Sequence, residues 1–313
     1  MTHHGIDIAL QKLRAHIDGT VLAKEPLAPY TAYRIGGPSA IWVVPADELA
    51  VGSALAVIAT LDLPLFVLGR GTNLLVSDTG WPGITLYLGN NLSGWSLAAS
   101  GATALAGTPL TDFIRAAVAE GLGGMEHMAG IPGSVGGALM MNAGAFGQEI
   151  EGVVAAVRGF ERNGTPFRIE RRQAAFQYRA APGLKDRVVT AGEFIFSPAD
   201  PVELTRRLSQ TLARRTAKQP LHRPSCGSVF KRPAGNYAGA LIEAAELKGE
   251  RIGDAMISPK HAGFILNMGR ANASEVYALI CRIQDRVAAR FGVRLEREVR
   301  LLGQFDDGFY SGG

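Results

Sequence analysis

The sequence has few cysteines, few charged residues and no long run of one charge. Two cysteines, Cys226 and Cys281, are too few for a disulfide framework or for the four ligands of a structural zinc site. This favours a reducing, cytoplasmic compartment. Charged residues make up only 19% of the chain, against about 25% in typical soluble proteins. The net charge is +4 and no four Lys or Arg residues are consecutive, so small anionic ligands are favoured over nucleic acid.

Long hydrophobic segments are also missing. Residues 1–17 contain charged side chains throughout, which is not typical of a secretory signal. Residues 49–68 are apolar, but Gly52, Ser53, Asp62 and Pro64 divide them into pieces shorter than the ~20 residues of a membrane span. We therefore expect neither export nor membrane insertion. The six histidines show no paired metal-ligand spacing, so we expect no metal, with His127 and His261 packed or hydrogen-bonded.

Glycine, in contrast, is abundant, and hydrophobic periodicity is clear. The fold class predicted is α+β, with an N-terminal helix and linker at 1–29, a larger domain at 30–197 and a smaller α/β domain at 198–313. Helices are expected at 6–17, 47–61, 202–216, 238–247 and 274–291, and a further helix is expected to begin with Thr111 as its cap. Strands are expected at 40–44, 65–68 and 293–302, and a hairpin is expected to pair 153–161 with 165–170. Residues 306–313 are expected to form a frayed end.

A first glycine turn follows the apolar strand at 65–68. Gly69 and Gly71 flank one residue, and Thr72 and Asn73 come next. Backbone N–H groups in such a turn can bind phosphate oxygens, with the hydroxyl and the amide as further donors. A dinucleotide fingerprint would need a third glycine where Leu74 stands. A tight turn without a ligand remains the alternative for this segment alone.

A second glycine-rich segment spans residues 130–147. Its first nine residues hold four glycines, a proline and a serine, so the backbone can approach a flat or phosphorylated ligand closely. Two such segments indicate one large cofactor between them, and a glycine-packed helix interface is the alternative. Neither segment contains lysine, which disfavours a P-loop nucleotidase.

The last third contains a basic loop, residues 218–233, with two serines and Cys226. Such a loop can bind an anion beside a weak proton donor, Ser228, or it can be a solvated turn. Glu296 and Glu298 alternate with arginines, a pattern that is often a surface ion-pair ladder. Both cysteines are expected to be unreactive.

Seven segments, in order along the chain, resemble one family. They are "YTAYRIGGPSA", "LGRGTNLLVSD", "GMEHMAGIPGSVGGALMMNAGAFGQEI", "FQYR", "KQPLHRPSCGSVFKRP", "SPKHAGFILN" and "LEREVRLLG", and they cover residues 30–303. The chain is thereby similar to the UDP-N-acetylenolpyruvoylglucosamine reductases, in the short branch without an extra tyrosine-bearing loop. The resemblance implies a two-lobed FAD-binding domain of the vanillyl-alcohol-oxidase (PCMH) type and a small α/β C-terminal substrate domain.

The resemblance also implies the reaction and its residues. FAD, bound non-covalently and reduced by NADPH, would reduce UDP-N-acetylglucosamine enolpyruvate to UDP-N-acetylmuramate for peptidoglycan and the cell wall. The implied catalytic residues are Arg179, Ser228 and Glu298. The implied cofactor-binding residues are Gly69, Gly71, Thr72, Asn73, Leu74, Ile131, Pro132, Gly133, Ser134, Gly137, Asn142 and Gly144. The implied substrate-binding residues are Tyr178, Lys218 and Lys231.

Two other functions compete with this one. A flavin oxidase of the same cofactor fold would use oxygen as acceptor. A nucleotide or nucleic-acid binder would account for the sequence pI of about 9.2 and would bind DNA with a steep salt dependence. The reductase interpretation expects only small-molecule partners, with no obligate protein partner, nucleic acid or membrane.

Overall fold

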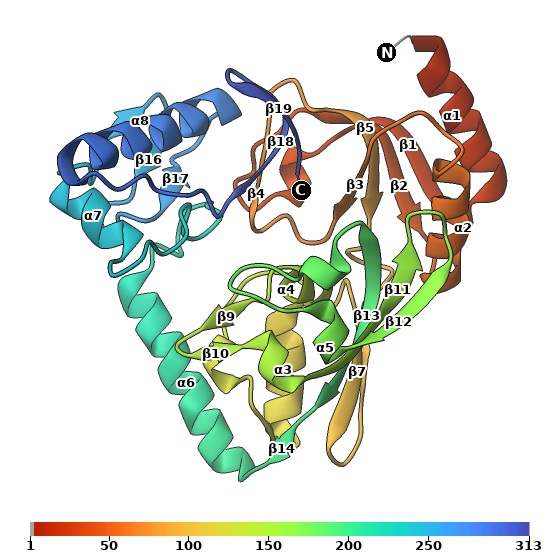
Figure 1. Ribbon diagram of the computed structural model, residues 1–313, viewed down its shortest axis with the longest axis horizontal. Coiled ribbons are helices and arrows are strands. Elements are labelled where there is room, and N and C mark those ends of the chain that lie inside the picture. Colours follow the sequence, from red (N-terminus) through yellow and green to blue (C-terminus); the bar gives the residue numbers. More distant parts are fainter. Residues whose placement is uncertain (1–2, 313) are drawn as a thin grey trace. The chain divides into compact units, whose positions relative to one another are not determined.

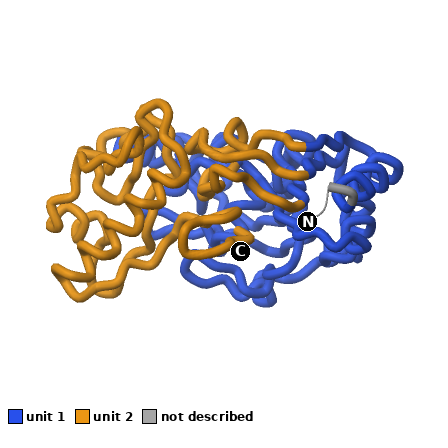
Figure 2. The backbone as a smooth tube through the Cα atoms, turned by 90° about the horizontal axis from the view of Figure 1, so that it is seen from above, with its two compact units in different colours: residues 1–23, 41–70, 84–215 blue, residues 24–40, 71–83, 216–313 orange. Residues whose placement is uncertain are grey.

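The computed structural model describes residues 3–312, and their side chains from residue 5 onward. Residues 1, 2 and 313, at the ends of the expected 1–29 and 198–313 ranges, lie outside the described part. The chain forms two compact units, each built from separate segments (Figure 2). Unit 1 contains residues 1–23, 41–70 and 84–215, and unit 2 contains residues 24–40, 71–83 and 216–313.

The first lobe of unit 1 is a sheet that packs against helices α1 and α2 (Figure 1). The sheet has the strand order β1-β2-β5-β3, and β3 runs parallel to β5. The bounds are α1 His3–His16, β1 Gly19–Pro26, β2 Pro38–Pro45, α2 Glu48–Ile58, β3 Leu65–Leu68 and β5 Trp81–Tyr87. Asp47 caps α2 by accepting a hydrogen bond from Ala50 N at 2.8 Å, as expected from its place before an apolar run. Buried Ile41, Leu55 and Ile84 form the core of this lobe.

The second lobe of unit 1 is built on an antiparallel sheet in the order β12-β11-β13-β7-β6. Helices α3 and α4 and the unit-1 part of α6 bury apolar side chains in its core, where Phe113, Phe194 and Phe196 meet. The bounds are β6 Trp95–Leu97, β7 Gly101–Leu105, α3 Leu110–Ala119, β8 Leu122–Gly123, α4 Val135–Met140, β9 Gly144–Ala145, β10 Gln148–Glu149, β11 Val154–Glu161, β12 Pro166–Glu170, α5 Arg171–Ala174, β13 Arg187–Ile195, β14 Ser197–Pro198 and α6 Pro201–Lys218. Short 3-10 turns lie at Glu126–Met128, Ile150–Val153 and Pro182–Leu184.

Unit 2 holds two small three-stranded sheets (Figure 1). One has the order β15-β16-β17 and packs against α8, and the other has the order β19-β18-β4. The bounds are β4 Leu74–Val76, α7 Ala238–Ala244, β15 Arg251–Ile252, β16 Ala255–Ile257, β17 Ile265–Asn267, α8 Ala273–Phe291, β18 Arg300–Phe305 and β19 Gly308–Ser311, with a 3-10 turn at Ala28–Tyr30. Helix α8 begins with a capping box of Asn272 and Glu275 and ends at Gly292, whose φ of 66° suits glycine.

Several expected elements are confirmed and several boundaries were wrong. The hairpin of β11 and β12 is present, as are the helices at 6–17, 202–216 and 274–291 within a few residues. Thr111 does not cap α3, because the helix begins one residue earlier with Pro109 as its cap residue. Proline fixes φ near the helical value and has no N–H that needs a partner.

The closing strand also differs from expectation. It begins at Arg300, where the backbone gains Leu74 of β4 as a parallel partner, and not at Val293. Between 293 and 299 the only strand-like pairing in the described chain is a single bridge of Arg297 with Phe230. Residues 308–311, expected to be frayed, form β19 on β18. A polar alternating sequence does not reveal which residues find a ladder partner.

No helix among residues 3–312 combines the length and the apolar character that crossing a membrane requires.

Candidate active site

The second glycine loop is held in place by the start of α3. Leu110 N donates to Gly133 O at 3.0 Å, and Thr111 Oγ1 donates to Ile131 O at 3.3 Å. Gly133 has a φ of 135°, a conformation that side chains rarely allow. Ser134 follows as the cap residue of α4, only 2% exposed. Thr111 therefore fixes the predicted cofactor loop, although it does not cap its own helix.

The two glycine segments predicted to share a cofactor meet inside unit 1. An added Cβ at Gly69 would lie 2.7 Å from Ser134 Oγ, closer than real Cβ atoms approach. The same Oγ accepts a hydrogen bond from Gly137 N at 3.3 Å. Only glycine at position 69 lets the first turn lie against the second loop. This close backbone approach fits a cofactor with a diphosphate and flat rings.

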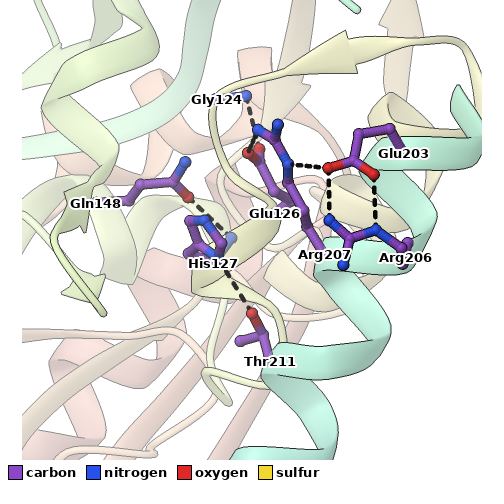
Figure 3. Close-up of polar contacts among 8 residues, drawn as sticks. All are labelled: Gly124, Glu126, His127, Gln148, Glu203, Arg206, Arg207 and Thr211. Atoms are coloured by element: carbon purple, nitrogen blue, oxygen red, sulfur yellow. Dashed lines mark hydrogen bonds and ion pairs between the residues drawn. The ribbon is translucent and has the colours of Figure 1, made fainter. Parts of the chain in front are cut away.

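A buried carboxylate supports the segment that leads into this loop (Figure 3). Glu126 is 3% exposed, and its Oε2 accepts a hydrogen bond from Gly124 N at 2.8 Å. Burial raises the pKa of Glu126, but the backbone N–H donors together with His127 and Gln148 outweigh it, so the net pKa is below the usual value. Arg207 of α6 lies 3.6 Å from the second carboxylate oxygen.

His127 also ties this segment to its neighbours (Figure 3). Its backbone N donates to Gln148 Oε1 at 2.8 Å, and its Nδ1 is 3.2 Å from Thr211 Oγ1 on α6. The expectation that His127 is hydrogen-bonded is therefore confirmed. No role for Glu126 was expected from the sequence, and His127 was expected only to be packed or hydrogen-bonded. Their hydrogen bonds show that both hold the segment before the loop. The family segment "GMEHMAGIPGS" was the available signal.

Asn142 is enclosed at the end of the glycine-rich segment. Its Nδ2 donates to Glu149 Oε2 at 2.9 Å and to Gln177 O at 3.2 Å, and its Oδ1 accepts from Glu151 N at 3.2 Å. The amide group of this predicted cofactor residue thus ties the segment to the turn that carries Tyr178 and Arg179.

Arg179 lies in a strained turn next to the same segment. Its φ is 57°, uncommon for a residue with a side chain, and its Nη2 donates to Gly144 O at 3.2 Å. The guanidinium also lies 4.9 Å from the ring centroid of Tyr178, which is 48% exposed. Strained turns often occur at functional sites. Unit 1 therefore brings Gly144, Tyr178 and Arg179 together.

In unit 2, the residues after the first glycine turn begin a strand. Gly71 has a φ of 57°, and an added Cβ would lie 2.2 Å from Tyr30 O. Asn73 follows Thr72 and precedes β4, where Leu74 is 3% exposed. Asn73 Nδ2 donates to Glu298 O at 3.0 Å, a contact that the sequence did not predict.

Hydrogen bonds to Val229 join the segment that carries Ser228 to the segment that carries Glu298. Val229 O accepts hydrogen bonds from Glu298 N at 2.8 Å and from Val299 N at 3.2 Å. Ser228 is exposed and pairs with Phe264 in an isolated bridge. Two predicted catalytic residues, 70 positions apart in the sequence, are therefore neighbours on adjoining segments.

Gly263 was missed as part of the surroundings of Ser228. Its O accepts from Val229 N at 2.9 Å, and a Cβ there would lie 3.7 Å from Ser228 Oγ. His261 Nδ1 accepts from Gly263 N at 3.1 Å, which confirms the expected hydrogen bond. Burial is the largest influence on the pKa of His261 and lowers it, favouring the neutral ring. The family segment "SPKHAGFILN", which contains His261 and Gly263, was the available signal.

The predicted substrate lysines differ in their surroundings. Lys231 is close in space to Glu296, with Nζ 2.5 Å from Oε1, and its backbone N donates to Glu296 O. Glu296 is thus in an ion pair, as the surface pattern suggested, but its partner is a lysine and not a neighbouring arginine. Lys218 is the exposed last residue of α6.

Both cysteines are free thiols. Cys226 is buried and donates to Leu74 O at 3.2 Å, and burial raises its pKa to about 12. A thiol with this pKa stays protonated and is a poor nucleophile near neutral pH. Over the described part of the chain, no group of three or more His, Cys, Asp or Glu side chains could hold a metal ion.

Comparisons with known proteins agree with this arrangement. Residues 219–302 match the UDP-N-acetylenolpyruvoylglucosamine reductase C-terminal domain, and residues 39–170 match an FAD binding domain. A UDP-N-acetylenolpyruvoylglucosamine reductase of Synechococcus sp. is 42% identical over 301 residues, covering 95% of this chain and 96% of that protein. One from Levilactobacillus brevis is 41% identical, with 91% and 93% covered. The chain belongs to the UDP-N-acetylenolpyruvoylglucosamine reductase family.

A solved structure supports the same family. The crystal structure of UDP-N-acetylenolpyruvylglucosamine reductase from Thermus caldophilus matches with a TM-score of 0.74 and 32% identity, covering 91% of this chain and 99% of that one. The fold is thus an FAD-binding domain of the PCMH type followed by the family's C-terminal domain. Family membership favours a flavin-dependent reductase over the oxygen-using oxidase and the nucleic-acid binder.

Proposed function

We propose that this protein reduces UDP-N-acetylglucosamine enolpyruvate to UDP-N-acetylmuramate, a step of peptidoglycan synthesis, with FAD as cofactor and NADPH as co-substrate. Support comes from UDP-N-acetylenolpyruvoylglucosamine reductases that match almost the whole chain. The observation that carries the proposal is the hydrogen bond from Glu298 N to Val229 O, which joins the backbone segments that carry Ser228 and Glu298. A weak proton donor and a carboxylate on adjoining segments fit reduction of a carbon–carbon double bond.

FAD would bind at the glycine loops. The candidate residues are Gly69, Gly71, Thr72, Asn73, Leu74, Ile131, Pro132, Gly133, Ser134, Gly137, Asn142 and Gly144. The contact with Ser134 leaves no room for a side chain at position 69. A backbone without side chains at such positions can approach a cofactor closely. Bound by these residues, FAD would supply the hydride chemistry that links NADPH to the substrate.

Ser228 would supply the proton that completes the reduction. Hydride addition to the enolpyruvyl double bond leaves a basic carbon, to which a serine hydroxyl can donate although it is a very weak acid in water. The thiol in the same loop, Cys226, is buried. Glu298 would polarise the substrate beside Ser228.

Arg179 would stabilise the carboxylate of the enolpyruvyl group, which gains negative charge during hydride addition. A guanidinium can hold a carboxylate with two parallel hydrogen bonds. Tyr178, Lys218 and Lys231 would bind the UDP-sugar, with Lys218 at the exposed end of α6 as the clearest candidate for an anion. Residues 30–197 would bind FAD and residues 198–313 the substrate, in a cytoplasmic enzyme with small-molecule partners only.

The test separates the two half-reactions by stopped-flow spectroscopy. In Ser228→Ala, flavin bleaching by NADPH should proceed at the wild-type rate, because that step needs no proton donor for substrate carbon. Recovery of the flavin colour on addition of the UDP-sugar should slow by about 10² to 10⁴. Ser225→Ala, which removes a hydroxyl from the same loop, is the matched control and should leave both steps unchanged.

Two results would contradict the assignment. A wild-type protein without flavin, or without turnover of the UDP-sugar, would refute the function itself. A Ser228→Ala variant that recovers its colour as fast as wild type would leave the function standing and move the donor elsewhere, with Ser225 next in order.

A further inference from the structure

Glu298 lies where the regular strand pairing ends. The parallel ladder of β4 and β18 pairs Leu74 with Arg300 and continues toward Val76 and Leu302. Glu298 is two residues before β18, in an irregular segment. The hydrogen bonds of this ladder therefore do not hold its backbone, and contacts outside the ladder do so.

Asn73 supplies one of these contacts. Its Nδ2 donates to Glu298 O at 3.0 Å, while its own backbone O accepts from Arg300 N at 3.1 Å. Asn73 is thus hydrogen-bonded to the residues on both sides of Val299. The peptide group of Glu298 is held on its other side by Val229, which accepts its N–H at 2.8 Å. Holding both ends of a residue fixes its φ and ψ, and with them the direction of its side chain.

Arg297, the preceding residue, is anchored independently. Its Nη2 donates to Tyr310 Oη at 3.1 Å and its Nη1 to Tyr277 Oη at 3.4 Å. The segment before Glu298 therefore keeps its place without Asn73. The Asn73 side-chain amide therefore contributes one hydrogen bond to this segment, to the carbonyl of Glu298.

We propose that Asn73 is a positioning residue for the Glu298 carboxylate, so that this residue of the predicted flavin turn also orients the substrate-polarising group. The inference rests on the proposed function and goes beyond it, because it gives Asn73 a role exerted through another residue. A small displacement of a reacting group can cost on the order of 10² in rate. Loss of a single orienting hydrogen bond should then cost about tenfold.

The experiment measures FAD affinity by fluorescence titration and both half-reactions by stopped flow, per bound flavin. At FAD concentrations that saturate the variant, Asn73→Ala should slow flavin recovery with the UDP-sugar about tenfold more than it slows flavin bleaching by NADPH. Asn73→Asp, which keeps the shape but loses the donor, should behave alike. Asn236→Asp is the control, because exposed Asn236 lies in the same unit and its Oδ1 accepts from Tyr237 N, which aspartate can also do.

A double-mutant cycle with Glu298→Gln decides the route of the effect. If Asn73 acts through the Glu298 carboxylate, Asn73→Ala should change the recovery rate by less than about twofold in the Glu298→Gln background. Additive losses, or bleaching that slows as much as recovery in Asn73→Ala, would overturn the proposal, since Asn73 would then act through the flavin alone. Wild-type recovery in Asn73→Ala or in Glu298→Gln would overturn it as well, whereas an inactive wild type would refute the proposed function.

Discussion

Close contact between Gly69 and Ser134 allows a quantitative test of the loop arrangement in unit 1. An alanine Cβ at position 69 would lie 2.7 Å from Ser134 Oγ but 3.7 Å from Ser134 Cβ, an ordinary contact distance. The clash is therefore with the hydroxyl alone. Ser134 is 2% exposed and holds the first turn of α4, so it has little room to move.

The magnitudes follow from this geometry. Gly69→Ala should destabilise unit 1 by about 2 kcal/mol, within the ~1–3 kcal/mol range for overpacking. Ser134→Ala should cost about 1 kcal/mol through loss of the cap hydrogen bond to Gly137 N. The double variant Gly69→Ala/Ser134→Ala has no hydroxyl to clash with, so it should cost only about 1 kcal/mol and not the additive ~3 kcal/mol.

Urea denaturation followed by circular dichroism would measure these differences, and flavin fluorescence would measure FAD binding. Gly69→Ala should also weaken FAD binding by about tenfold or more. This is the expected loss if the displaced loop costs at least about 1.4 kcal/mol of binding free energy, which corresponds to a factor of ten. Gly152→Ala is the matched control, because a Cβ there meets nothing within 4 Å. Additive losses in the double variant, or unchanged FAD affinity in Gly69→Ala, would refute the contact and its link to the cofactor.

Three further predictions concern single side chains. The net pKa of Glu126 is lowered, so its ionised form stabilises the fold above the unfolded value of 4.5, and that stability is lost as pH falls through the lower folded pKa. Glu126→Gln should lower the unfolding midpoint at pH 7 and flatten its decline below pH 4.5, measured by thermal denaturation across pH; an unchanged pH profile would count against the buried carboxylate. Arg179→Lys should lower the rate of flavin recovery with the UDP-sugar by roughly 10² or more, because lysine lacks the planar fork for a carboxylate, and near-wild-type turnover would exclude this role. Lys218→Ala should raise KM by about tenfold with little change in kcat in steady-state assays, as expected for uniform binding of a substrate anion, whereas a collapsed kcat with the same KM would place Lys218 in the chemistry.

The sequence alone determined the local elements and the family. Asp47 before an apolar run predicted the start of α2, and Asn163-Gly164 between alternating strands predicted the β11–β12 hairpin. These signals work because caps and tight turns depend on residues within a few positions. Seven segments in order identified the reductase family, which the comparisons confirmed.

Only the tertiary structure decided which distant residues meet. Nothing near Gly69 in the sequence shows that Ser134 lies against it, and nothing near Asn73 shows that it holds the carbonyl of Glu298. The error in the closing strand has the same origin, since β18 begins where β4 becomes its partner, and the alternating pattern of residues 293–299 extends beyond that point. Long-range pairing depends on the path of the whole chain, and local side-chain preferences do not determine that path.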